Sequence, residues 1–266
     1  MLNMSTTIER CKNCGGPLQS LVSPCEYCDS LPGPLPSWRI PRDLPRPRVS
    51  NLGRYRVGDR QYLVHGGLAP GVFLARRDSP LTEMVILKVG EVQAEWERMR
   101  AVHRLCAGRF LGRLLPEPVH CALSDSGKRV LVYRWRREFQ RTLASYSGRV
   151  PAEAGVWLSH RLLEQLHELH GLGFQHGNLT AEHMLAHSDA HGLMLCGWSH
   201  CRPGQGSDVA DGLKAIAGTL VSNVPAPLRR LLTSARGSAF EVNEELKRVN
   251  AAVLGPRKFC PLSQLQ

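Results

Sequence analysis

Four cysteines near the start of the chain have the residue type and spacing of a metal site. Cys11 and Cys14 form one Cys-x2-Cys pair, and Cys25 and Cys28 form a second pair after ten intervening residues. Each turn of this kind directs two thiolates at one ion, so two turns complete a tetrahedral Zn²⁺ site with no open position for chemistry. Free or disulfide-bonded cysteines are the alternative. We expect a structural zinc ion.

Residues 8–30, which contain these cysteines, resemble the zinc-ribbon family of small metal modules. A segment of about thirty residues buries too little apolar surface to fold alone, so the metal would supply the folding free energy. The resemblance implies a separate module whose role is structural or recognition rather than catalysis.

A second group of polar residues follows a long amphipathic segment. The stretch from His176 to Leu185 reads HGNLTAEHML, and LMLCGWS follows at Leu193 to Ser199. These two stretches resemble the catalytic loop and the magnesium-binding strand of protein kinases. In that family the loop supplies an Asp that accepts the proton of the substrate hydroxyl and an Asn that holds a metal ion.

The residues at the chemically active positions of this resemblance differ from those of the family. Asn178 stands in the place of the Asp, Thr180 in that of the Lys, and His183 in that of the metal-binding Asn. The metal-binding Asp of the DFG motif falls on Cys196, or on Gly197 if the preceding hairpin is one residue longer. In the second register Trp198 takes the place of the Phe. Because phosphoryl transfer depends on charge neutralisation by magnesium, the resemblance implies a pseudokinase that does not bind Mg²⁺.

Two further charged residues fit the nucleotide site that the resemblance implies. Lys88 in VILK stands where the family has a lysine that contacts the nucleotide phosphates and pairs with a helix glutamate. Met99, Val102 and Leu105 recur near helical spacing and place Glu95 one turn earlier on the same inward face. Lys88 and Glu95 are therefore a candidate ion pair, either for ATP binding or with a purely structural role.

Three short strands are predicted between Gln61 and Val89, and the turn HGGLAPG joins the first two. This is the place of the kinase glycine-rich loop, with Gly66 and Gly67 as candidate phosphate-binding residues. Pro70 lacks an amide hydrogen where the family favours glycine. A phosphate loop and a plain hairpin turn both fit the pattern.

The remaining landmarks are architectural. VHCALSD and KRVLVYRW predict a hairpin, and GVWLSHRLLEQLHELHGLGF predicts an amphipathic helix that stops near Gly171 and Gly173. Asp208 stands where the resemblance implies a buried Asp that holds the catalytic-loop backbone. Only eleven residues separate Cys196 from Asp208, too few for the long activation segment that seats a peptide substrate. The predicted fold class is thus α+β, with a two-lobed kinase-like domain whose C-lobe is trimmed.

The predicted domains are a zinc ribbon (8–30), a Pro/Arg-rich linker (31–54) and a kinase-like domain (55–258). The N-lobe covers about 55–133 and the C-lobe about 137–258. The linker contains six prolines, which favour extended backbone. Residues 39–60 carry seven arginines against two aspartates, which suits either a solvated spacer or an arm that docks on acidic protein or on nucleic acid.

Composition narrows the function classes without choosing among them. The net charge is +11, and no run of apolar residues is long enough to span a membrane. We expect a cytoplasmic protein with a protein partner and no membrane attachment. The favoured function is a catalytically impaired kinase-like binding or regulatory module. A divergent active Ser/Thr kinase and a zinc-ribbon nucleic-acid-binding regulator are the alternatives.

Overall fold

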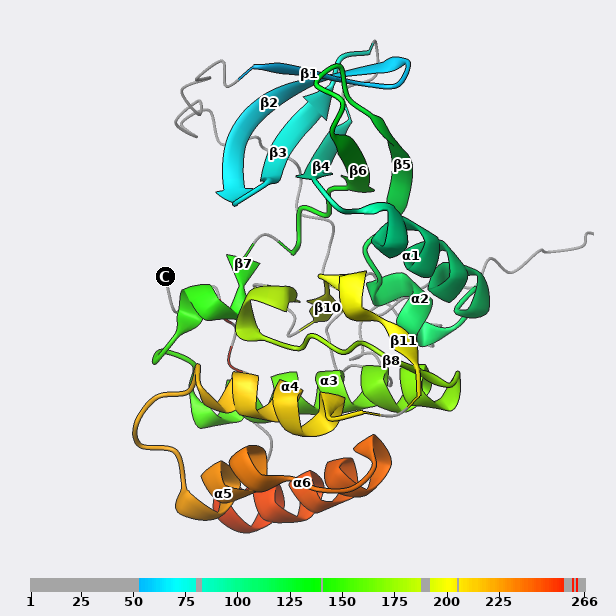
Figure 1. Cartoon of the computed structure of the whole chain (residues 1–266). Helices are drawn as coiled ribbons and strands as arrows, with labels where there is room; N and C mark the ends of the chain where they lie inside the picture. Colours follow the sequence, from blue (N-terminus) through cyan, green and yellow to red (C-terminus); the bar gives the residue numbers. More distant parts are fainter. Residues whose placement is uncertain are drawn as a thin grey trace, which may run out of the picture.

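The computed structural model of the protein describes residues 53–79, 83–139, 141–187, 192–204 and 206–255, together with Cys260 and Leu262. A curled β-sheet lies at one end, and a larger group of helices lies at the other (Figure 1). The protein is therefore of the α+β class, as its sequence predicts. Cys11, Cys14, Cys25 and Cys28 and nearly all of the Pro/Arg-rich segment lie outside the described residues. Within the described part of the chain, no helix is long and apolar enough to cross a membrane.

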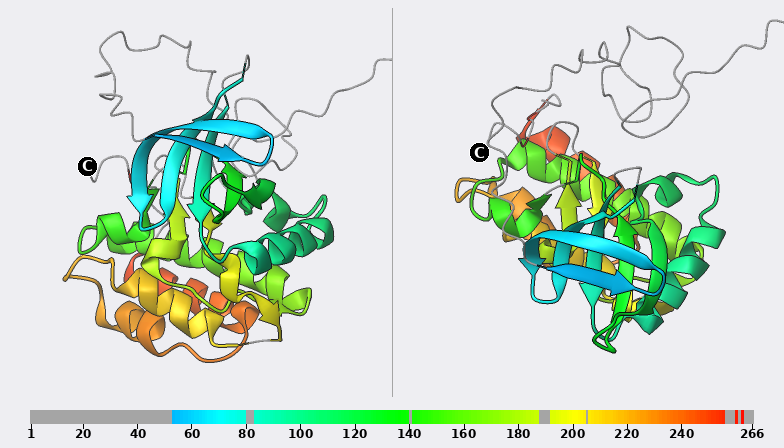
Figure 2. Two further views of the ribbon diagram at one scale, coloured as in Figure 1. Left: turned by 45° about the horizontal axis from the view of Figure 1, so that its top comes forward. Right: turned by 90° about the horizontal axis from the view of Figure 1, so that it is seen from above.

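The sheet contains six antiparallel strands in the order β1-β2-β3-β4-β6-β5. Its strands are β1 (Arg54–Val57), β2 (Arg60–Ala69), β3 (Val72–Arg77), β4 (Met84–Val89), β5 (Pro118–Leu123) and β6 (Arg129–Arg134). The sheet curls so far that its two edge strands meet, because Val57 at the end of β1 bridges to Ser124 just after β5. The β1–β2 ribbon consequently crosses over the other strands when the molecule is seen from above (Figure 2). This closure leaves a small apolar core inside the curl, formed by Val57, Tyr62, Val64, Ala75, Val85, Leu87, Val130 and Val132.

The hairpin between β2 and β3 differs from the expected glycine loop. Gly66 and Gly67 lie within β2, where they pair with Leu74 and Phe73 across irregularities in the register. The turn itself is only Pro70 and Gly71, a Pro-Gly combination typical of a type II turn, and Gly71 has a φ of +71°. The prediction that HGGLAPG forms the turn was wrong for its first five residues. Gly66 and Gly67 can lie in a strand because neither has a positive φ.

Helix α1 (Gln93–Leu105) follows β4 and packs against the sheet side of the molecule. Glu95, Met99 and Val102 are buried on its inner face, as the helical spacing predicts. Leu105 is 46% exposed, so the inward stripe ends one turn before the prediction placed it. The reason is that α1 ends at Leu105 and the chain turns through Gly108 into the short helix α2 (Phe110–Leu114).

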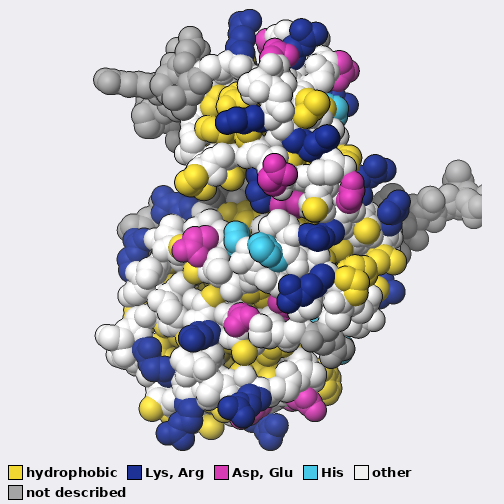
Figure 3. Space-filling view, in the orientation of Figure 1, with side chains coloured by type: hydrophobic (Ala, Val, Ile, Leu, Met, Phe, Trp, Pro, Cys, Tyr) yellow, Lys and Arg dark blue, Asp and Glu magenta, His cyan; other side chains and the backbone are white. Residues whose placement is uncertain are grey.

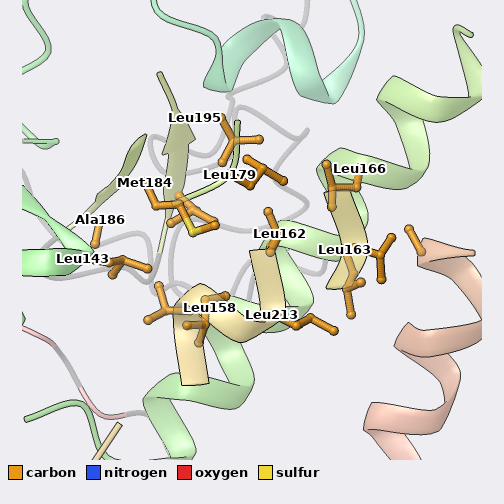
Figure 4. Close-up of a cluster of buried hydrophobic side chains, with 14 of the residues drawn as sticks. Leu143, Leu158, Leu162, Leu163, Leu166, Leu179, Met184, Ala186, Leu195 and Leu213 are labelled. Carbon is orange, nitrogen blue, oxygen red and sulfur yellow. The ribbon is translucent and has the colours of Figure 1, made fainter. Parts of the chain in front are cut away.

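Helix α3 (Ala152–Gly171) is the central element of the helical part and ends at one of the glycines that predict its stop. It packs against α4 (Asp208–Ala217) and α6 (Ala239–Val253), and α4 also contacts α5 (Ala226–Ser234). The buried leucines of α3 recur at helical spacing and meet Leu179, Met184, Leu195 and Leu213 from other elements (Figure 4). This apolar contact fixes the segment from His176 to Leu195 against the helices. Helices α5 and α6 complete this group at its C-terminal end.

Short elements connect the sheet to the helices. They are β7 (Arg141–Thr142), η1 (Leu143–Tyr146), β8 (Phe174–Gln175), η2 (Ala181–His183), β9 (Met184–Ala186), β10 (Leu193–Leu195), η3 (Trp198–His200) and β11 (Arg202–Pro203). β9 pairs with β10 and β7, and β8 pairs with β11. These pairings place the loop after β8 beside the loop after β10. The predicted polar positions are therefore brought together.

Candidate functional site

The Lys88 and Glu95 side chains meet between β4 and α1. Lys88 Nζ lies 2.5 Å from Glu95 Oε2, so the predicted ion pair is confirmed. Glu95 is 1% exposed, whereas the Lys88 side chain is 29% exposed. Removing one partner of a buried ion pair lowers the stability of a protein by about 3–5 kcal/mol. Because Lys88 is partly exposed, we expect a loss near or below the lower end of that range for this pair. The pair ties α1 to the sheet and leaves the lysine partly open to solvent.

Tyr133 of β6 completes the environment of Glu95. Its hydroxyl donates to Glu95 Oε1 over 2.7 Å, so both carboxylate oxygens of Glu95 are occupied. Desolvation by burial, with a contribution from the Glu95 charge, holds the pKa of Tyr133 well above its ordinary value, and the phenol stays a neutral donor. Sequence reasoning missed this residue. The sequence did contain a signal, because Tyr133 is the one residue with a polar group in the apolar run VLVY. A buried tyrosine hydroxyl usually forms a hydrogen bond.

Asp208, at the start of α4, binds the backbone of the loop after β8. The Asp208 carboxylate accepts hydrogen bonds from the amides of His176 (2.6 Å) and Gly177 (2.8 Å), and from His170 Nε2 (3.3 Å). Burial by itself raises the pKa of Asp208, but these hydrogen bonds outweigh it and bring the pKa below the ordinary value. The predicted scaffold role of Asp208 is confirmed. Its carboxylate is an anion whose hydrogen bonds hold the loop backbone and His170 in place.

His176 is buried and locks this loop to the segment after β10. Its Nε2 donates to the carbonyl of Cys196 (3.0 Å), its Nδ1 accepts from the amide of Asn178 (3.3 Å), and its ring packs edge-on against Trp198. These partners require the neutral imidazole, because a carbonyl accepts and an amide donates. Burial lowers the pKa of His176 to about 4, against an opposing effect of Asp208. The imidazole is therefore structural.

The loop positions that would handle protons and metal ions carry different chemistry. Nδ1 of His183 donates to the carbonyl of Asn178 over 2.9 Å and lies 3.4 Å from the Thr180 hydroxyl. The Asn178 carboxamide cannot serve as a base at neutral pH. Imidazole nitrogen is a poor ligand for Mg²⁺, which prefers oxygen.

Gly197 lies directly against the ring of His183. It has a φ of +78°, and a Cβ built on it would lie 2.6 Å from His183 Cδ2. Neither the backbone angle nor the space favours a side chain here. Gly197 therefore lies beside His183, one of the loop residues that the sequence singles out. A carboxylate at this position is incompatible with the His183 ring as it lies.

Cys196 lies close enough to the Lys88 and Glu95 pair for their charges to act on its thiol. Desolvation raises the pKa of Cys196 to about 12, with Glu95 adding to the increase and Lys88 opposing it. The thiol is neutral at physiological pH and is neither a strong nucleophile nor a ready metal ligand. Its backbone amide donates to the carbonyl of His183 over 2.9 Å, which joins the two loops.

Carboxylates are scarce around this site. Within residues 176–187 and 192–204, the described parts of both loops, Glu182 is the one acidic residue. It is exposed, and hydrogen bonds from its own amide and from Thr180 lower its pKa. In the described part of the chain, no group of three or more His, Cys, Asp or Glu residues is arranged to hold a metal ion. The partly exposed Lys88 side chain is a positive group that this site can offer to an anion.

A link between the two parts of the molecule was also missed by sequence reasoning. The Arg98 guanidinium on α1 donates to the carbonyl of Ser199 in η3, and α1 and η3 pack together. The two residues are 101 positions apart in the sequence, so no local pattern predicts their contact. Arg98 connects the helix that carries Glu95 to the segment that carries Trp198.

The sequence predictions thus divide into four groups. Lys88, Glu95 and Cys196 lie together at one end of the site, and Asn178, Thr180, His183 and Gly197 lie together on the two loops. Gly66 and Gly67 lie in strand β2, and the four zinc-ligand candidates lie outside the described residues. The chain matches no protein-family model, and no curated protein is similar to it at a significant level.

Proposed function

We propose that this protein is a catalytically impaired, protein-kinase-like binding or regulatory module. The arrangement of the elements supports this proposal. The six-stranded sheet and α1 lie on one side of the candidate site, and a bundle of helices centred on α3 lies on the other (Figure 1). Lys88 pairs with Glu95, as we expect of the nucleotide site that the resemblance implies, and Asp208 binds the amides of His176 and Gly177, as we expect of its scaffold. The C-lobe is trimmed, because β11 and four more residues lead directly into α4.

One observation carries the proposal. The positions that would move a proton or hold magnesium are Asn178, His183 and Gly197, and none of them carries a carboxylate. His183 donates to the Asn178 carbonyl, and its ring fills the space that a side chain at Gly197 would need. Catalysis of phosphoryl transfer rests mainly on electrostatic stabilisation, and these positions provide no anion to recruit the metal.

Nucleotide binding is a separate part of the proposal. Lys88 is partly exposed and can attract a phosphate, but Glu95 already neutralises much of its charge. The β2–β3 hairpin is paired up to Ala69 and Val72, so fewer amides are free to cover a phosphate than in an open loop. ATP binding should accordingly be weak and indifferent to magnesium.

The test combines a γ-phosphate transfer assay with thermal-shift titration of ATP, with and without Mg²⁺, on the full chain. We expect no transfer and a small stabilisation that is equal with and without the metal. Lys88→Met should remove that stabilisation, and Lys214→Met, at an exposed lysine on α4, should not. Transfer at ordinary kinase rates, or stabilisation that requires magnesium, would overturn the proposal.

The alternative of a divergent active kinase has one observation in its favour. Glu182 places an exposed carboxylate two residues after Thr180, on the loop itself. Glu182→Gln is the discriminating variant, because it removes the charge at nearly constant shape. Transfer activity that is lost in Glu182→Gln and retained in Glu164→Gln would favour the enzyme.

We also propose that the N-terminal cysteines hold one structural zinc ion, on the strength of their spacing. Elemental analysis of protein purified without chelators should find about one zinc per chain, lost in Cys11→Ser or Cys25→Ser. The kinase-like part should remain folded in both variants. A nucleic-acid-binding regulator is the competing function, and it would show as RNA or DNA binding that falls steeply with salt.

A further inference from the structure

The corner between α1 and α2 is an exposed, strongly basic surface. From Arg98 to Pro116 the chain contains five arginines and His103, and it contains no Asp or Glu. Arg100, Arg104 and Arg109 are exposed. None of these three arginines has an ion-pair partner among the described residues.

An apolar side chain lies among these charges. Leu105 is 46% exposed at the end of α1, between Arg104 and the turn that leads to Arg109. Figure 3 shows hydrophobic side chains gathered over the α1 and α2 region, with Lys and Arg side chains around them. An exposed leucine within a rim of unpaired guanidinium groups is a combination that fits a partner carrying both apolar and acidic groups.

The nearby carboxylates do not neutralise this corner. Glu97 lies on α1 toward β5, since its charge acts on the Cys121 thiol. Glu168 of α3 accepts a hydrogen bond from the amide of Leu111 over 2.8 Å and so caps the start of α2. Neither forms an ion pair with Arg100, Arg104 or Arg109 among the described residues, so the three arginines keep their positive charge.

We propose that this corner, formed by Arg100, Arg104, Leu105 and Arg109, docks an acidic segment of a protein partner that places an apolar side chain on Leu105. The inference rests on the proposed role as a binding module and names where that binding occurs. Nucleic acid fits less well, because neither nearby aromatic ring is free for base stacking: Trp96 is covered by the Arg100 guanidinium at 5.2 Å, and Phe110 packs against a core cluster. A membrane fits less well, because one exposed leucine gives little apolar area to insert.

The test uses fluorescence anisotropy of the full chain with a fluorescein-labelled peptide of sixteen residues, in which leucine recurs at helical spacing and glutamate fills the other positions. The variant Arg100→Glu/Arg104→Glu/Arg109→Glu should weaken binding by at least about tenfold. The matched control is Lys214→Glu/Arg230→Glu/Arg236→Glu, which changes the net charge equally at exposed residues of the helical end. It should weaken binding only about twofold, through general steering.

A second pair of measurements separates the apolar contact from charge. Leu105→Ser should weaken binding by roughly fivefold and leave its salt dependence unchanged, because it removes buried apolar area only. A glutamate peptide without leucine should bind Leu105→Ser and the wild type equally. If the glutamate variant does not fold, the triple Arg→Gln variant carries the same expectation at a smaller charge change.

Several outcomes would overturn the inference. The first is an equal loss of peptide affinity in the two triple variants, and the second is no binding of the acidic peptide at all. The third is that the corner variant loses binding specifically to a labelled RNA or to phosphatidylserine vesicles and not to the peptide. Failure of the proposed function is distinguishable, because phosphoryl transfer by the full chain would refute that function and leave the peptide result standing.

Discussion

The two ends of the loop from His176 to His183 use similar polar residues in opposite ways. At its start, His176 and the amide of Gly177 are bound to Asp208, Cys196 and Trp198 by contacts that are buried and fully matched. At its end, Asn178 and His183 bind each other, and the neighbouring Gly197 provides no side chain. The first end keeps the loop in shape. The second end keeps the shape through a histidine ring and a backbone carbonyl, and Glu182 is the one carboxylate there.

This comparison teaches that architecture and chemistry can be separated on a single loop. The buried anion Asp208 cannot be removed without leaving two amides unsatisfied in the interior, whereas the hydrogen bond between Asn178 and His183 uses the Asn178 backbone carbonyl and does not depend on its side chain. The variants below test this difference, from the largest expected effect to the smallest.

Asp208→Asn should have the largest effect. The carboxamide replaces a charged acceptor of three hydrogen bonds and turns an amide group toward backbone amides, so the free energy of unfolding should fall by about 3–4 kcal/mol. Urea denaturation measures the change. Asp211→Asn, at an exposed acid on the same helix, should cost less than about 0.5 kcal/mol. Equal effects of the two variants would refute the special role of Asp208.

Acid should weaken the same end of the loop through His176. The pKa of His176 is about 4 in the folded protein against 6.5 for an unperturbed imidazole, so the unfolded chain binds more protons between these values. Stability is therefore complete above about pH 6.5 and decreases as the pH falls toward 4, by about 3 kcal/mol for this group. Asp208, whose pKa is lowered, adds its own loss only at still lower pH. An NMR titration that places the His176 midpoint near 6.5 would contradict this.

Gly197→Asp tests whether this position can accept a carboxylate. The positive φ and the His183 ring both oppose the new side chain, so we expect a loss of stability of about 2 kcal/mol. Adding His183→Asn should recover about half of it, because it removes the ring that the Asp would meet. Additive losses in the double variant would show that the ring is not the obstacle. Gly148→Asp, a positive-φ glycine with open space around it, is the control for backbone strain alone.

Tyr133→Phe should give the smallest effect, at the opposite side of the site. It removes one hydrogen bond to the Glu95 carboxylate and should lower stability by about 1–1.5 kcal/mol. A double-mutant cycle with Glu95→Gln should show that the two changes are not additive, since both act on one contact. Tyr55→Phe in β1 should be nearly neutral. A neutral Tyr133→Phe variant would mean that water replaces the phenol.

Much of the site was predictable because its signals are local. The VILK lysine, the helical spacing that turned Glu95 inward, and Asp208 at a helix start each depend on a few neighbouring residues. The glycine hairpin was predicted less well, because glycine in a loop and glycine at a strand irregularity look alike in sequence. Leu105 was assigned to the core because periodicity alone does not show where a helix ends.

The sequence alone determined the class of the fold, the order of its main elements, and the residue types available at the site. Those features follow from periodicity, from turn residues and from side-chain chemistry, which act over short distances. Only the tertiary structure decided that Tyr133 occupies the second oxygen of Glu95, that Arg98 reaches Ser199, and that the His183 ring closes the space at Gly197. Each of these depends on segments that the chain brings together from far apart, and hydrophobic burial rather than local preference sets that arrangement.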